Sequence, residues 1–315
     1  MASVAQSSAA VSVASRRLRI PWFSWLMIAP VLIVVVVLNI YPLILGMIMS
    51  FYQFDLMLPN RPFIGLENYQ TLYKDARFWT ATVNTFAFAA LGIPLGIVLG
   101  LAVALLLNGK TPMRGGLRAA VLIPWVVPPP VAASIWLWMY STTFSPINDL
   151  LMKIGLIVKP ISFVGDTTQF GPFSLPMLSV AVVRVWEGFP FAAIMLLAGL
   201  QAIPPSLYEA AAIDGANAWK RFWSITLPML KPVFQLILTL NAIGAVSHFN
   251  LNYIMTKGGP QDLTNVVAVY LYLTSFELYK LGYGSAIAGA LFLVTGALAA
   301  LYIVRTLKTI GSARA

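Results

Sequence analysis

Six long apolar runs constrain this chain more than any other feature of its sequence. A helix that spans a bilayer needs about 20 apolar residues. Hydrophobic residues make up 59% of the chain and charged residues 10%, whereas soluble domains carry about 25% charged residues. An ordinary soluble enzyme is therefore excluded, and we predict an all-α integral membrane protein with six transmembrane helices. The runs are Phe23–Phe51, Trp79–Leu107, Ala119–Tyr140, Met177–Ile203, Val233–Met255 and Ala286–Leu307.

Prolines and charges interrupt two of these runs. Pro124 and 128–130 break the third run, and Arg184, Glu187 and Pro190 interrupt the fourth. Backbone breaks at membrane depth need neighbouring helices or a cavity to satisfy the freed polar groups. We therefore expect the third and fourth helices to face the interior of the bundle.

Three glycines in the second run are spaced four residues apart. Gly92, Gly96 and Gly100 form two overlapping steps of small residues, which allow another helix to approach closely. We expect close helix packing at these positions.

The positive charges indicate the orientation of the chain, because cytoplasmic loops carry an excess of lysine and arginine. With both termini in the cytoplasm, the net charge of +10 lies on that side, so it requires no nucleic-acid partner. We predict a multi-pass protein in contact with membrane lipid, with both termini in the cytoplasm. The cytoplasmic cations are then Arg16, Arg17, Arg19, Lys110, Arg114, Arg118, Lys220, Arg221, Lys231, Arg305, Lys308 and Arg314.

The predicted cytoplasmic loop at 203–232 has strong local signals. Ser206 and Glu209 have the spacing of a capping box, which predicts a short helix over 208–213. Asp214 and Gly215 follow, and glycine is typical of a helix end. We expect a second helix over about 216–226 that ends before Pro228 and Pro232. Its aromatic residues fall on one face: Trp219, Phe222 and Trp223.

This predicted helix pair admits two interpretations. An exposed apolar face on a rigid cytoplasmic element favours docking of a protein. The alternative is an interfacial hairpin on the lipid headgroups.

The loop carries a family signature. The run Glu209-Ala-Ala-Ala-Ile-Asp214-Gly215-Ala216, with Phe222, Ile225 and Leu227-Pro228 after it, resembles the EAA motif of bacterial ABC importer permeases. The chain is most similar to the carbohydrate-uptake branch, related to the maltose and glycerol-phosphate permeases. Further matching pieces are Gly65-Leu-Glu-Asn-Tyr69, Phe78-Trp79 with Asn84-Thr85, Ala198-Gly-Leu-Gln201 and Thr256-Lys-Gly-Gly-Pro260.

The resemblance implies a type I importer permease of a bacterial cytoplasmic (inner) membrane, multi-pass, with a cytoplasmic coupling helix pair. The pair would insert into a groove on a cytoplasmic ATPase subunit. The implied partners are a second homologous permease subunit in a heterodimer, two ATPase subunits and an extracytoplasmic solute-binding protein. The implied coupling residues are Tyr208, Glu209, Ala210, Ala211, Asp214, Gly215, Trp219 and Phe222.

The chain itself offers no nucleotide site. Asn108-Gly-Lys-Thr111 resembles the end of a phosphate-binding loop, but that motif needs a glycine where this sequence has Ala104. We expect no cofactor in this chain, no enzyme activity of its own and no metal site. ATP and Mg would be bound by the partner ATPase subunits.

Ionisable groups inside a membrane are candidates for function. Arg184 and Glu187 can pair at i, i+3, or Arg184 can bind an anionic group of the substrate through its planar fork. The resemblance places sugar contacts in this part of the fourth run and just before the Gly-Gly-Pro turn. The candidate substrate residues are Arg184, Trp186, Glu187, Asn250, Asn252 and Tyr253.

The two asparagines raise a geometric question. Asn250 and Asn252 point about 200° apart on a regular helix, so both reach one site only if the helix is irregular there. Asn250 and Tyr253, at i, i+3, share a face. The single histidine, His248, is expected to pack by hydrogen bonding.

The function predicted from the sequence is a permease subunit of a binding-protein-dependent ABC importer for a sugar or sugar derivative. Arg184 inclines this hypothesis towards a phosphorylated, acidic or sulfonated sugar. The alternative is a secondary transporter driven by an ion gradient, and an intramembrane enzyme is a third possibility. Predicted segments are a disordered cytoplasmic tail (1–19), the six-helix permease domain (20–310, with the coupling loop at 203–232) and a second cytoplasmic tail (311–315).

Overall fold

The computed structural model describes residues 22–109, 114–245 and 248–312. The predicted tail at 1–19 and most of the tail at 311–315 lie outside these residues, as do Arg16, Arg17, Arg19, Lys110 and Arg314. The chain consists of two units, residues 1–46 and 47–315, and each is described by itself.

The first unit is helical throughout its described part. It contains α1 (Trp22–Val35), the π-helical turn η1 (Val36–Ile40) and the start of α2 (Tyr41–Met49). In η1 the Tyr41 N–H bonds to the Val36 carbonyl, five residues back. Pro42 follows directly, and a proline removes one backbone donor. The wider π turn lets the helix continue across this position.

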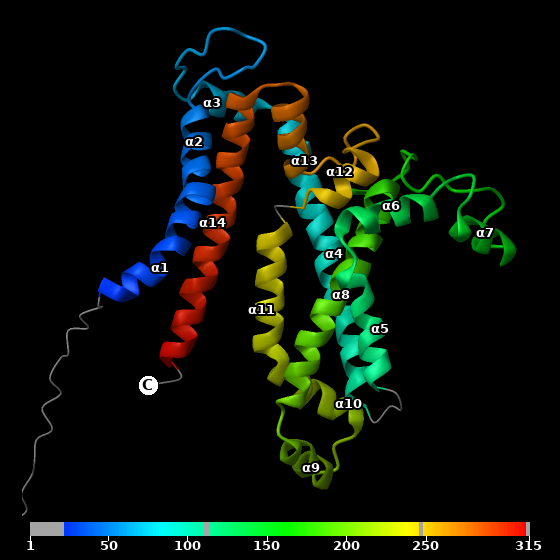
Figure 1. The fold of residues 1–315 in the computed structure, drawn as a ribbon. Helices are drawn as coiled ribbons and strands as arrows, with labels where there is room; N and C mark the ends of the chain where they lie inside the picture. The colour runs from blue at the N-terminus through cyan, green and yellow to red at the C-terminus, as the bar shows by residue number, and fades with distance from the viewer. Residues whose placement is uncertain (1–21, 110–113, 246–247, 313–315) are drawn as a thin grey trace, which may run out of the picture. The chain divides into compact units, whose positions relative to one another are not determined.

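The second unit holds the remaining elements (Figure 1). Its two short strands pair antiparallel, with Phe170 opposite Phe173. Its elements are α3 (Glu67–Lys74), α4 (Ala76–Asn108), α5 (Arg114–Val126), α6 (Pro129–Met139), α7 (Pro146–Lys153), β1 (Gln169–Phe170), β2 (Phe173–Ser174), α8 (Leu175–Gln201), α9 (Pro205–Ile213), α10 (Ala218–Arg221), η2 (Phe222–Thr226), α11 (Leu227–Ala245), α12 (Asn250–Thr256), α13 (Val267–Tyr272), η3 (Leu273–Glu277) and α14 (Leu281–Ser312).

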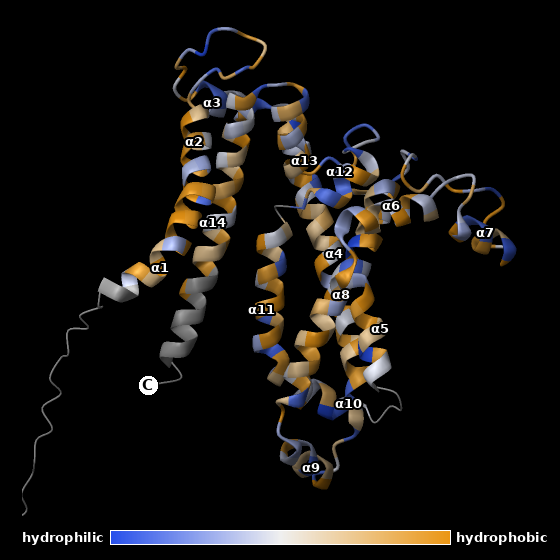
Figure 2. Ribbon diagram, in the orientation of Figure 1, coloured by the Kyte–Doolittle hydropathy of each residue, from blue (hydrophilic) through white to orange (hydrophobic). Residues whose placement is uncertain are grey.

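Within the described residues, five helices are long and apolar enough to cross a membrane, and a bent pair of helices brings the number to as many as six. Figure 2 shows the hydrophobic residues along these helices. The bent pair joins α5 to α6 at an angle of 93°, where the sequence predicted a break at 128–130. The five helices are Trp25–Met49, Ala76–Asn108, Leu175–Gln201, Ala218–Ala245 and Leu281–Leu301.

The pair α4–α8 forms the centre of the second unit. At Gly100 an added Cβ would lie 2.7 Å from the Ala192 Cβ and 3.0 Å from the Ala193 backbone nitrogen. The predicted close approach is thus confirmed at Gly100. It is not found at Gly96, where a Cβ would meet nothing within 4 Å.

One expectation about the interrupted helices needs correction. Helix α8 is continuous through Arg184, Glu187 and Pro190, because neighbouring helices bury it and its ladder loses only the proline donor. Helix α5 contacts α8 and buries Pro124, while most of its other described side chains are exposed on the single chain. The expected position of α5 in a bundle interior remains a prediction.

A polar network fixes the segment that follows α12. The Arg77 guanidinium bonds Asp262 with Nε–Oδ2 and Nη2–Oδ1 distances of 3.0 Å each. Asp75 caps α4 by accepting from the Arg77 N–H at 2.9 Å, and the Tyr270 and Tyr283 hydroxyls donate to its Oδ2. Burial raises the pKa of Asp75, but these hydrogen bonds outweigh it and hold the pKa below its usual value. The carboxylate stays ionised at neutral pH.

Candidate functional site

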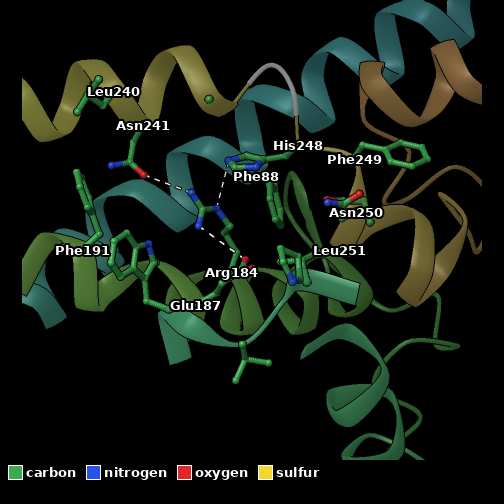
Figure 3. A pocket seen from close by; sticks show the side chains of 16 residues that line it. Phe88, Arg184, Glu187, Phe191, Leu240, Asn241, His248, Phe249, Asn250 and Leu251 are labelled. Carbon is green, nitrogen blue, oxygen red and sulfur yellow. Dashed lines mark hydrogen bonds and ion pairs between the residues drawn. The ribbon is translucent and has the colours of Figure 1, made fainter. Parts of the chain in front are cut away.

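A cavity of about 430 Å³ lies among α4, α5, α8, α11 and α12 in the second unit. Its walls combine aromatic rings with a small set of polar side chains, as small-molecule sites do. Figure 3 shows these side chains converging from separate helices. The polar members are Arg184, Glu187, Asn241, His248, Asn250 and Asn252.

Arg184 is the centre of the polar set. Its Nε donates to His248 Nε2 at 3.2 Å, and its Nη2 donates to Asn241 Oδ1 at 3.4 Å. Its Nη1 lies 3.9 Å from Glu187 Oε2, which is an ion pair too long for a hydrogen bond. Arg184 therefore links α8, α11 and the segment before α12 while the outer edge of its guanidinium stays open (Figure 3).

The length of the Arg184–Glu187 contact helps to distinguish a structural ion pair from an arginine that binds substrate. A purely structural pair is expected to close to hydrogen-bond distance, about 2.7–2.9 Å. Here both N–H groups on Nη1 lack an acceptor among the described residues, and both oxygens of Glu187 lack a donor there. The side chain of Arg184 is 21% exposed. The pair presents an open donor next to an open acceptor.

Glycines create the space that Arg184 occupies. An added Cβ at Gly188 would lie 2.9 Å from Arg184 Nη1, and one at Gly92 would lie 3.5 Å from Arg184 Cγ. At Gly244, on the opposite wall, a Cβ would meet nothing within 4 Å. The position of the guanidinium thus depends on the missing side chain at Gly188.

Both asparagines of α12 line the cavity. Both lie in α12, which begins at Asn250 and is separate from α11, so they reach the cavity from the first turn of a new helix. Asn252 is buried and donates to the Thr264 carbonyl at 3.2 Å, while its Oδ1 has no described partner. Asn250 is exposed. The predicted fifth span over Val233–Met255 is corrected: α11 ends at Ala245, and residues 246–247 lie outside the described part.

Two of the predicted substrate residues do not line the cavity. The Tyr253 ring stacks on Phe249 at 4.8 Å, and its hydroxyl donates to Glu277 at 3.3 Å. The Trp186 ring packs edge-on against Trp136 at 5.8 Å. Their roles as substrate contacts remain predictions.

Several cavity residues were missed by the search for ionisable groups. Asn241 is an amide in an apolar helix, and a search for buried amides would have found it. The aromatic walls carry no local signal, because single aromatic residues are common in spanning helices. These walls are formed by Phe88, Trp125, Phe191 and Phe249.

A helical hairpin made of α9, α10 and η2 lies at the other end of the second unit from α3 and α13 (Figure 1). Helix α9 ends as predicted: Gly215 has φ +76°. The Gly215 N–H bonds to the Ala212 carbonyl at 3.1 Å, and the Ala216 N–H bonds to that of Ala211 at 2.8 Å. These two bonds satisfy the carbonyls at the helix end.

The predicted capping box is wrong. Helix α9 begins one turn earlier, with Pro205 at its first position and Pro204 as N-cap without a side-chain hydrogen bond. A proline at this position costs no hydrogen bond and presets the helical φ. Ser206 is therefore inside the helix, and Glu209 is left without a hydrogen bond or ion pair among the described residues.

The second arm also differs from its predicted extent. Asn217 caps α10 by accepting from the Lys220 N–H at 2.8 Å, and the helix runs without a stop into α11. In η2 the Leu227 N–H bonds to the Phe222 carbonyl five residues back, directly before Pro228. This π turn carries the helix past Pro228, as η1 does at Pro42, so neither Pro228 nor Pro232 ends it.

The aromatic face of the second arm is confirmed. The rings of Trp219 and Trp223 lie 5.6 Å apart, and Phe222 contacts both. Trp219 is 70% exposed and Trp223 is 53% exposed. The Tyr208 hydroxyl lies 2.9 Å from Thr226 Oγ1, which joins the two arms. Among the other predicted coupling residues, Glu209, Ala210 and Asp214 are exposed and Ala211 is half-buried.

The fold and these two sites define a membrane permease with an exposed helical hairpin. Residues 92–308 match the family described as binding-protein-dependent transport system inner membrane component. The chain belongs to this family, and it is a multi-pass protein of the inner membrane.

Named relatives cover nearly the whole chain. The trehalose/maltose transport system permease protein MalF of Thermococcus litoralis is 39% identical over 282 residues, 89% of this chain and 92% of the relative. The sulfoquinovosyl glycerol transport system permease protein SmoG of Agrobacterium fabrum is 36% identical over 286 residues, 90% of each chain.

Solved structures share the fold. A chain of a bacterial ABC transporter involved in the import of the acidic polysaccharide alginate matches with a TM-score of 0.78. The identity is 22%, and the match covers 91% of this chain and 96% of that chain. The fold of this protein is therefore that of an ABC importer permease.

Proposed function

We propose that this chain is the translocating subunit of an importer for a sugar or sugar derivative. One observation carries the proposal: a cavity with polar walls lies among helices long and apolar enough to cross a membrane, and the same unit carries an exposed helical hairpin. The hairpin receives the motion of ATPase subunits, and the cavity receives the substrate. The family description supports a transport role, and it leaves the gradient-driven alternative without support.

The chemistry of the cavity supports a sugar. Each sugar hydroxyl both donates and accepts hydrogen bonds, and Arg184 and Glu187 offer an open donor beside an open acceptor. Asn250 lines the same cavity as an exposed amide that can both donate and accept, and Trp125 offers a ring face for a pyranose. Two relatives at 39% and 36% identity are named for transport of sugars, trehalose/maltose and sulfoquinovosyl glycerol.

The open edge of Arg184 also suits an anionic substituent. The free Nη1 and Nη2 protons form a fork that matches a carboxylate, sulfonate or phosphate. We propose that Arg184 contacts such a group where the sugar carries one. Glu187 lies 3.9 Å away and restricts the direction from which the anionic group can reach Arg184, because its carboxylate repels an anion that approaches from its side.

The proposed assembly contains a second homologous permease, two cytoplasmic ATPase subunits that bind ATP and Mg, and an extracytoplasmic solute-binding protein. The described part of one chain supplies up to six spans, and the second permease completes the wall around the pathway. Both termini lie in the cytoplasm in this proposal. The ATPases drive alternating access because they bind ATP more tightly in one state of the permease than in the other.

The test is the ATPase rate of the reconstituted assembly with its binding protein. Binding protein loaded with trehalose is compared with binding protein loaded with an acidic or sulfonated sugar. Stimulation by a loaded form supports the proposal and identifies the substrate class. An assembly without a co-purifying ATPase, and without stimulation by any sugar, contradicts it.

A further inference from the structure

The bent pair α5–α6 leads to a segment with exposed apolar side chains, to which the proposed transport mechanism assigns no role. Helix α6 leaves α5 at 93°, so if α5 crosses the membrane, α6 runs nearly parallel to its plane. One face of α6 is buried through Ala132 and Ala133. Its other face exposes the large side chains Val131, Ile135 and Trp138.

Exposed apolar side chains continue beyond α6. Leu150 and Ile154 lie one turn apart at the C-terminal end of α7 and just after it, and both are 59% exposed. In the turn that follows, Leu156 is 70% exposed and Val158 is 99% exposed. Monomeric soluble surfaces rarely gather apolar side chains in this way, and such patches mark a contact with a partner or a membrane.

The exposure is not a sign of an unformed loop. Ser145 caps α7 by accepting from the Asn148 N–H at 3.0 Å. Asn148 is buried, its Nδ2 donates to the Ile161 carbonyl at 3.0 Å, and its Oδ1 accepts from the Ile161 N–H at 2.9 Å. Asn148 thus closes the segment 149–160 at its base, and the fold holds the apolar side chains outward.

Charges beside the patch indicate what covers it. Lys153 and Lys159 are exposed within the segment, against the single acid Asp149. Lysines at the edge of an apolar surface reach lipid phosphates while their stems lie along the apolar chains. Trp138, 57% exposed at the end of α6, is a residue type that gathers at membrane interfaces.

We propose that residues 129–159 form an interfacial arm that lies in the outer leaflet. The apolar side chains of α6 and of the turn after α7 enter the acyl region, and Lys153 and Lys159 contact headgroup phosphates. The arm starts at Pro129, which lines the cavity, so lipid contacts hold this wall in place. The proposal rests on the membrane-spanning fold and does not depend on the identity of the substrate.

The experiment uses the absence of cysteine from the sequence. Leu156→Cys and Val158→Cys are labelled with nitrobenzoxadiazole in the assembly, with partner cysteines replaced, in vesicles of phosphatidylcholine and phosphatidylglycerol. Thr167→Cys, an exposed polar position of the same loop, is the matched control. ATPase stimulation by the loaded binding protein verifies that each labelled assembly is intact.

We expect nitroxide-labelled lipids to quench positions 156 and 158 several times more strongly than position 167, and iodide to quench in the reverse order. Adding Leu150→Glu should weaken lipid quenching at 158. Equal iodide quenching at all three positions overturns the proposal. Protection from both quenchers overturns it in favour of a protein cover, and protection that appears only with the binding protein identifies that protein as the cover.

Discussion

The cavity and the hairpin are built in opposite ways. The cavity takes one or two side chains from each of several helices, and its central arginine bonds to Asn241 and His248, 57 and 64 residues away. The hairpin is one contiguous stretch whose bonds are local, such as the Ala216 N–H to the Ala211 carbonyl. Substitutions in the cavity should therefore act through space, and those in the hairpin through backbone conformation or lost partner contacts.

The largest expected effect lies in the hairpin. Glu209→Ala should lower transport about a hundredfold, the upper range of a coupling free energy between sites, because Glu209 is exposed and its carboxylate is free for the ATPase. Basal ATPase activity and assembly should persist, since no described residue bonds this side chain. Transport into proteoliposomes and ATPase rate are measured together.

Two variants sharpen this result. Glu209→Gln keeps the shape and an acceptor, and it should recover part of the transport. Ser206→Ala, one turn earlier in α9 and not part of any cap, is the matched control and should transport normally. Wild-type transport by Glu209→Ala would remove this residue from the ATPase contact.

The second effect lies in the cavity. Arg184→Ala should lower transport by roughly thirtyfold, since hydrogen bonds to a charged group contribute about 1.5–3 kcal/mol each. Arg184→Lys keeps the charge but loses the fork, so an intermediate loss is expected. The α4–α8 contact at Gly100 does not involve Arg184, so size-exclusion chromatography should still show an intact assembly.

Loss of assembly in Arg184→Ala would instead make the arginine a structural partner of Glu187. The double variant Arg184→Gln with Glu187→Gln separates the cases, because it removes both charges and leaves no unpaired one. A structural pair predicts that the double variant assembles again. A substrate contact predicts that it assembles and still fails to transport.

The hairpin is held by local contacts and the cavity by contacts between distant helices, and this difference determines how well the sequence could predict each region. Hairpin signals are local: Gly215 stops α9, and the spacing of Trp219 and Trp223 gives their shared face. The errors in predicting the hairpin were also local. Pro205 fits the helix because it occupies the first position of α9, and Pro228 fits because a π turn precedes it. The six apolar runs likewise predicted the class of fold.

The cavity could be predicted only in part. Arg184 and Glu187 stand out because charges are rare in spanning helices, but nothing near Asn241 in the sequence indicates Arg184 as its partner. Helical spacing paired Asn250 with Tyr253, whereas α12 turns both Asn250 and Asn252 to the cavity and leaves Tyr253 on Phe249. These contacts depend on how helices distant in sequence pack, and no local pattern encodes that packing.

The third prediction tests whether added side-chain volume beside Arg184 weakens substrate binding in the cavity. Gly188→Ala places a Cβ 2.9 Å from Arg184 Nη1 and must move the guanidinium, at a cost of about 1.4 kcal/mol, in the upper range for an off-rotamer side chain. We expect roughly a tenfold rise in the substrate KM for transport and little change in basal ATPase. Gly244→Ala is the control, since it lines the same cavity with nothing within 4 Å. Equal effects of the two variants would show that the position of Arg184 is not limited by space.

The smallest effect tests whether the hairpin responds to backbone conformation. At Gly215 a Cβ would meet nothing within 4 Å, yet φ is +76°, so Gly215→Ala costs about 1 kcal/mol through the backbone alone. We expect a fall in transport of about fivefold at that cost, with the cavity unaffected. Asparagine tolerates the left-handed region better than alanine, so Gly215→Asn should lie between wild type and Gly215→Ala although its side chain is larger. If asparagine instead proves worse than alanine, size limits this position as well, and the ATPase surface closes tightly over the turn.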